Sequence, residues 1–141
     1  MRAKLREIAE AAQTDPKQAL LDALPDAIAQ YEVFHNRVLV ATYVRPEKTR
    51  GGIILADRSL AEDRFQGKVG LVIKVGPIAF VDDGGAKFGG IAVKPGDWVT
   101  YRPSDGIEVF FVDLNGRDAT PCRQLEDIHI LGRTPDPALI Y

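Results

Sequence analysis

The residues best able to do chemistry in this chain are two histidines and one cysteine: His35, His129 and Cys122. Neither histidine has a Cys or Glu at the spacing that metal ligands show. A nucleophilic cysteine needs an activating neighbour, and Cys122 stands in TPCRQ with no adjacent histidine. All three residues are therefore interpreted as structural, and neither a catalytic site nor a metal site is predicted.

Paired carboxylates and glycine-rich stretches are the other features that could bind or react. Asp82-Asp83 and Glu126-Asp127 are interpreted as turn or strand-edge residues, because acid–base catalysis also needs a pocket. The stretch GGAKFGG, residues 84–90, does not join a strand to a helix, as a phosphate-binding loop must. We therefore predict that the protein is not an enzyme and uses no cofactor.

Composition limits the partners. A chain of 141 residues with 45% hydrophobic residues predicts one domain with a real core. The net charge of −2 gives no basic surface for nucleic acid. A single cysteine fits a reducing, cytoplasmic location. No apolar run approaches the ~20 residues that span a bilayer, so no membrane partner is predicted.

Residues 1–32 are predicted to form a helical N-terminal extension. Leu20 and Ile28 belong to an apolar stripe at helical spacing. Pro16 suits the first position of a helix, and Pro25 is expected to kink or split it. Three arrangements remain open: the helices cap the β domain, pack between subunits, or stay unpacked until a partner binds.

From residue 33 to residue 133 the pattern is β. Residues 36–44 alternate with a period of two, and both faces are largely apolar, which predicts a strand buried on both sides. Short strands with frequent turns favour a small antiparallel barrel or sandwich. Further strands are predicted at 68–75, 98–102, 107–114 and 127–131, with a protruding hairpin or loop at 77–92, a long turn at 115–124 and an extended C-terminal tail at 134–141.

The most unusual stretch is residues 45–66, where a charged and polar segment surrounds an apolar triplet. Gly51 and Gly52 precede Ile53, Ile54 and Leu55. A loop of this length within a small domain is uncommon unless it is functional or disordered. Two interpretations are equally open from the loop alone. The triplet is an apolar anchor on a flexible tether that orders on a partner, or it is a short core strand.

The order of motifs along the chain resembles the GroES-type co-chaperonin family. The matching motifs are NRVLV (36–40), GGIIL (51–55), GKVGLVIKVG (67–76), VKPGDWVTY (93–101) and LEDIHIL (125–131). The resemblance implies a mainly β fold, a small GroES-like β-barrel over 33–133. It also implies a mobile loop at about 44–66 and a roof hairpin at about 77–92, with no catalytic site and no nucleotide bound by the chain itself.

The resemblance also implies partners. The family forms a homo-oligomeric ring, usually a heptamer, that docks on a GroEL-type chaperonin double ring in its ATP- or ADP-bound state and encloses a client polypeptide. Docking uses the tripeptide matched here by Ile53, Ile54 and Leu55, preceded by Gly51 and Gly52.

Two further sets of residues follow from the family pattern. Neighbouring subunits pair the first strand of one with the last strand of the next, and the roof hairpin closes the top of the dome. The predicted interface residues are Arg37, Val38, Leu39, Val40, Ile128, His129, Ile130 and Leu131, and the predicted roof residues are Val81, Asp82, Asp83, Gly84 and Gly85.

The chain departs from the family pattern in its N-terminal extension and at Asp105, where an aromatic residue is expected. A phage-encoded or otherwise specialised co-chaperonin, acting in a host cytoplasm, is one hypothesis for this divergence. The alternative function is a structural β-barrel protein, such as a virion or scaffold component, that assembles without binding a chaperonin. A zinc-dependent alcohol dehydrogenase is excluded, because the cysteine cluster and the Rossmann half are missing.

Overall fold

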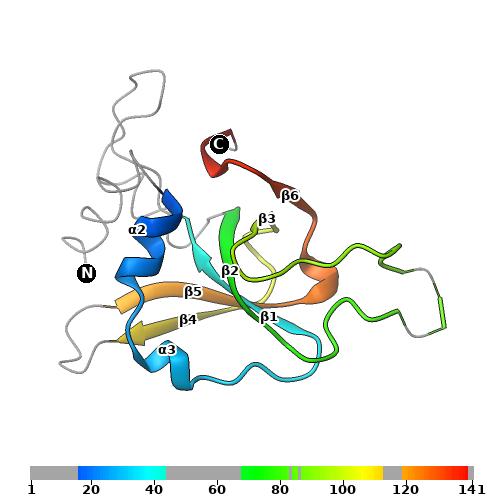
Figure 1. The fold of residues 1–141 in the computed structure, drawn as a ribbon, viewed down its shortest axis with the longest axis horizontal. Helices are drawn as coiled ribbons and strands as arrows, with labels where there is room; N and C mark the ends of the chain where they lie inside the picture. The colour runs from blue at the N-terminus through cyan, green and yellow to red at the C-terminus, as the bar shows by residue number, and fades with distance from the viewer. Residues whose placement is uncertain (1–15, 44–67, 83, 86, 113–118, 140–141) are drawn as a thin grey trace.

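The computed structural model describes residues 16–43, 68–82, 84–85, 87–112 and 119–139. Its strands form one antiparallel sheet in the order β4-β5-β1-β2-β3-β6 (Figure 1). The predicted mainly β, antiparallel fold class is confirmed. The strands are β1 (Arg37–Thr42), β2 (Val69–Val75), β3 (Trp98–Thr100), β4 (Ile107–Val112), β5 (Ala119–Glu126) and β6 (Gly132–Thr134).

Strand β1 lies in the middle of the sheet and is buried on both faces, as its sequence predicted. Leu39 and Ala41 belong to one buried apolar cluster, whereas Val38 and Val40 belong to another. Because successive side chains of a strand point to opposite faces, the two clusters lie on opposite sides of β1. The sheet therefore needs a cover on each face.

The N-terminal helices cover one of these faces. α2 (Pro16–Ala23) begins at the predicted proline, and α3 (Ala27–Gln30) follows Pro25. Leu20 and Ile28 are buried in the same cluster as Leu39, Ala41 and other residues of the sheet. Of the three arrangements left open by the sequence, the structure shows the first, because residues 16–30 cap the sheet (Figure 1). Across the described residues, no helix has the length and apolar character needed to cross a bilayer.

The predicted long turn at 115–124 is wrong over its second half, because Ala119–Glu126 forms the strand β5. Pro121 lowers the strand signal of this stretch, since proline cannot donate to a ladder. The pairs between β5 and β1 extend from Glu126 back to Cys122, which pairs with Ala41, and Pro121 lies just outside this ladder. The missing N–H therefore removes no bond to β1.

The predicted last strand at 127–131 is also wrong. Asp127–His129 forms the 3-10 turn η1, in which the backbone N–H of Ile130 donates to the carbonyl of Asp127. The last strand is β6 instead, and the tail is not extended, because Pro137–Leu139 forms a second 3-10 turn, η2. The alternating isoleucines Ile128 and Ile130 resemble a strand, but the contacts of the Asp127 side chain favour a turn here.

We name residues 77–92 the roof segment. It reaches away from the sheet, on the opposite side of the view from α2 and α3 (Figure 1). Its described residues form turns and no strand, so the hairpin expected there is a loop of turns. The Asp82 carboxylate closes this loop by accepting a hydrogen bond of 2.7 Å from the backbone N–H of Phe88.

One glycine is required by both its conformation and its surroundings. Gly106 has a φ of 72°, and a Cβ there would lie 2.4 Å from the carbonyl oxygen of Gln124. Gly84 has a similar φ of 78° but open space around it. Replacing Gly84 by alanine is expected to cost about 1–2 kcal/mol of unfolding free energy, from the left-handed backbone alone.

Gly106→Ala is expected to cost about 1–3 kcal/mol more than Gly84→Ala, because the methyl group also displaces β5. Urea unfolding of both variants at one protein concentration measures the difference. Equal losses would show that the contact between Gly106 and β5 is not close.

Candidate ring-contact site

The predicted docking residues lie outside the described residues. They are Gly51, Gly52, Ile53, Ile54 and Leu55. Among the predicted roof residues, Asp83 also lies outside, whereas Val81 is 57% exposed and Gly84 and Gly85 are exposed. The roles of both sets stay predictions.

Strand β1, which the family pattern pairs with another subunit, has both edges occupied in the described structure. Both of its edges are hydrogen-bonded within the chain, one to β2 and the other to β5. Val38, Leu39 and Val40 are 0% exposed. Within the single chain these three side chains are therefore not accessible to a neighbour, and their role at an interface stays a prediction.

The other predicted interface residues lie at the surface. Ile128 is 50% exposed and Leu131 is 59% exposed, whereas His129 and Ile130 are partly buried. Arg37 is partly exposed at the start of β1 and forms an ion pair of 2.9 Å with Glu126. The exposed apolar residues of 128–131 therefore remain available for contact with another chain.

A groove of about 580 Å³ separates these residues from the roof segment. The roof segment forms one wall of the groove with Phe80, Lys87, Phe88 and Ile91. The other lining residues are Val93, Asp127, Ile128, Ile130, Leu131, Gly132 and Arg133. The rings of Phe80 and Phe88 meet edge to face at 5.5 Å between centroids. Ile91 is 63% exposed at the rim. We name this feature, which has both apolar and charged lining residues, the roof-base groove.

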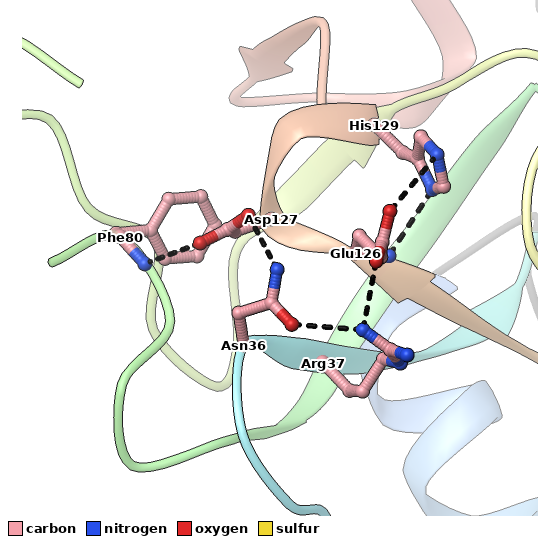
Figure 2. Close-up of polar contacts among 6 residues, drawn as sticks. All are labelled: Asn36, Arg37, Phe80, Glu126, Asp127 and His129. Atoms are coloured by element: carbon pink, nitrogen blue, oxygen red, sulfur yellow. Dashed lines mark hydrogen bonds and ion pairs between the residues drawn. The ribbon is translucent and has the colours of Figure 1, made fainter. Parts of the chain in front are cut away.

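Asp127 lines the groove, and its carboxylate joins three parts of the chain (Figure 2). Its Oδ1 accepts a hydrogen bond of 3.1 Å from Asn36 Nδ2, and its Oδ2 accepts one of 3.1 Å from the backbone N–H of Phe80. The Asp127 N–H donates to the carbonyl of Asn36 at 3.0 Å. Sequence reasoning missed this cluster, because its partners lie 91 and 47 residues away in the chain.

A second polar cluster fixes the turn η1 beside Asp127 (Figure 2). The Glu126 N–H donates to His129 Nδ1 at 3.1 Å, so this nitrogen is the acceptor. The other ring nitrogen, Nε2, lies 3.7 Å from Glu126 Oε2. Arg37 donates to both Asn36 Oδ1 and Glu126 Oε1, at 2.8 Å and 2.9 Å. The cluster locks the start of β1 against η1.

The structure does not bring the candidate catalytic residues together into a reactive arrangement. Cys122 is 0% exposed in the core beneath the helices, and burial raises the pKa of its thiol to about 12. His129 pairs with Glu126 in the turn η1, and His35 lies at the surface in a turn with a φ of 56°. Within the described ranges, no group of three or more His, Cys, Asp or Glu side chains could hold a metal ion.

Residues 30–129 match the protein family described as Chaperonin 10 Kd subunit. The chain is 32% identical over 104 residues to co-chaperonin GroES 2 of Mesorhizobium japonicum, which covers 74% of this chain and 91% of that protein. It is 34% identical over 103 residues to co-chaperonin GroES of Bartonella quintana, and the match covers 73% of this chain and 96% of that protein. It is 32% identical over 104 residues to co-chaperonin GroES of Pelagibacter ubique, and the match covers 74% of this chain and 99% of that protein. The chain therefore belongs to the chaperonin 10 kDa subunit family, the GroES-type co-chaperonins.

Proposed function

We propose that this protein forms a ring-shaped lid that docks on a nucleotide-bound GroEL-type double ring and closes its chamber over a client polypeptide, in the cytoplasm. The observation that carries the proposal is the family match over residues 30–129, which includes the whole docking motif GGIIL. The relatives are named co-chaperonins, and the match to them covers nearly their full length. The chain binds the chaperonin and the client but contributes no catalytic group.

Docking is assigned to Ile53, Ile54 and Leu55, which follow Gly51 and Gly52 in the segment 44–66. Burying one Ile or Leu side chain yields about 1.5–3 kcal/mol. Holding the segment in one conformation opposes that gain by about 1–2 kcal/mol for each residue ordered. A single triplet therefore binds weakly. Several triplets on one ring raise the effective concentration and give a stable but releasable complex.

A closed ring of identical chains needs two different surfaces that fit each other. We assign one surface to the roof-base groove. The other is the segment 31–34, which leads from α3 to β1 and belongs to no strand in the described structure. Tyr31 is in an extended conformation, and Phe34 is 61% exposed. Phe34 of one subunit would pack against the apolar residues of the roof-base groove of the next.

The family pattern implies a contact made by β1. In the arrangement proposed here, the contact is made instead by the segment 31–34, which directly precedes β1 in the chain. The backbone of Phe34 is held by the chain's own contacts, because its carbonyl accepts from the N–H of Arg37 at 3.2 Å. A Cβ on Gly76 would lie 3.0 Å from the same carbonyl oxygen, so the residue that follows β2 approaches it closely. The phenyl ring is thus presented outward on a fixed backbone, which lowers the entropy cost of contact.

Phe34→Asp and Leu131→Asp are each expected to dissociate the ring. Each removes an apolar anchor from the proposed contact, and losing a buried aromatic or aliphatic anchor weakens an interface by about 2 kcal/mol or more, roughly 30-fold. Sedimentation velocity measures the oligomer. Circular dichroism confirms that each subunit stays folded, as expected for side chains that are 61% and 59% exposed.

Mixing the two variants tests the head-to-tail arrangement. Phe34→Asp retains an intact groove and Leu131→Asp retains an intact Phe34, so the mixture is expected to form heterodimers with one good contact and no ring. Leu139→Asp is the matched control, because Leu139 is 68% exposed but does not line the groove. Dissociation by the control, or a ring that survives both variants, would contradict this interface.

Client refolding tests the function itself. A denatured client protein is diluted into a bacterial chaperonin with ATP, with and without the wild-type chain. Recovery of client activity that requires both the chain and ATP is expected. Recovery that is the same with and without the chain, for a client that depends on a standard co-chaperonin, would contradict the proposed function.

A further inference from the structure

Asp127 is the residue that connects the two walls of the roof-base groove. One of its carboxylate oxygens holds the backbone of Phe80, which lines the first wall. The residue itself begins η1, which leads directly into Ile128 and Leu131 in the second wall. The carboxylate is 5% exposed and is drawn between the two segments in Figure 2.

The contact to Phe80 holds an unusual backbone conformation. Phe80 has a φ of 63°, which is strained for a residue with a side chain. Such a conformation persists only where surrounding contacts impose it. A hydrogen bond from an N–H to a carboxylate is stronger than one between neutral groups. Asp127 therefore selects the direction in which the roof segment leaves β2.

The second wall is held independently of Phe80. The Glu126–His129 contacts shape η1, and Arg37 ties Glu126 to β1. The oxygen Oδ1 of Asp127 is occupied by Asn36. Only Oδ2 reaches across to the roof segment. A change confined to that oxygen would release one wall of the groove and leave the other in place.

We propose that Asp127 is a positioning residue that couples the roof segment to occupancy of the roof-base groove by the neighbouring subunit. The proposal rests on the proposed ring. A neighbour seated in the groove packs against both walls, so it favours the conformation in which Phe80 is bound to Asp127. By linkage, the bound conformation of Phe80 favours the neighbour by the same factor.

The wild-type chain gives the first test, by hydrogen exchange of peptides from 77–82. Exchange is measured at a protein concentration where the ring is intact and again after dilution to monomers. The coupling predicts that exchange in 77–82 slows on ring formation, by roughly 5- to 100-fold, the usual range of coupling between sites. A role of Asp127 in monomer stability alone would leave this difference at zero.

Asp127→Asn gives the second test. The amide keeps an oxygen for Asn36 but places an N–H group opposite the N–H of Phe80. Exchange at Phe80 is expected to rise by roughly 10- to 100-fold, as for the loss of a hydrogen bond to a charged group. The exchange rate at Phe80 should no longer depend on whether the ring is formed. The ring of this variant should dissociate at a protein concentration about tenfold higher than the wild-type ring does.

Thr120→Ala is the matched control. Thr120 is 1% exposed and donates a hydrogen bond of 3.0 Å to the carbonyl of Ala23, far along the sheet from the groove. Thr120→Ala should reduce stability without changing ring affinity or the ring dependence of exchange in 77–82.

The same response from Asp127→Asn and Thr120→Ala would overturn the coupling, as would equal exchange in the wild-type ring and monomer. A wild-type chain that never forms a ring would overturn the proposed assembly itself, and the coupling with it.

Discussion

Ile54→Asp is expected to abolish binding to a nucleotide-bound chaperonin and to leave the ring intact. The substitution removes an apolar contact worth about 1.5–3 kcal/mol and adds a charge that an apolar binding site cannot solvate. Because every subunit of the ring carries the change, the loss of avidity is much larger than the loss at one site. Co-sedimentation with a chaperonin in ADP measures binding, and sedimentation velocity measures the ring.

Ile107→Asp is the control for this prediction. Ile107 is 62% exposed at the start of β4 and lies outside the docking motif. It should bind the chaperonin as the wild type does. Binding that survives Ile54→Asp, or is lost equally in both variants, would show that the triplet 53–55 is not the docking contact.

Leu20→Ala is expected to produce the largest loss of stability among simple truncations in the N-terminal extension. Leu20 is 2% exposed and packs from α2 into the cluster that contains Trp98. Truncating a buried leucine leaves a cavity and costs about 2–5 kcal/mol. Urea unfolding, followed by the fluorescence of the single tryptophan, reports the loss directly.

The adjacent leucine is the control. Leu21 lies on the same helix but is 44% exposed, so Leu21→Ala should change stability by no more than about 0.5 kcal/mol. A small effect of Leu20→Ala would mean that α2 is not part of the core. Equal effects of the two substitutions would lead to the same conclusion. The family match begins at residue 30, so the contribution of Leu20 to the core comes from a segment outside the matched region.

Strands with strong alternation were predictable from the sequence, and strands with weak alternation were not. β1 and β2 fall within two residues of the predicted ranges, because their runs of Val, Ile and Leu leave few alternatives. β5 was missed because ATPCRQLE contains a proline and several polar residues. Its pairing with β1 and β4 is a tertiary effect that outweighs these local preferences.

The candidate site was predictable only in part. The docking triplet was predicted from motif order and stays a prediction, and of the predicted interface residues Ile128 and Leu131 are exposed. The burial of Val38–Val40 was predicted from the apolar faces of their strand, whereas the pairing of both strand edges within the chain was not, because the sequence of one strand does not reveal its neighbours. The Asp127 cluster could not be predicted, because no local pattern relates a carboxylate to a backbone N–H 47 residues away.

Native mass spectrometry of the purified chain tests the central claim most directly. The chain is measured alone, then with a bacterial chaperonin, and finally with the chaperonin and ADP. We predict a closed ring, heptameric or close to it, that joins the chaperonin only when nucleotide is present. A chain that forms an oligomer but ignores the chaperonin in both states would contradict the account and favour a structural role for this fold.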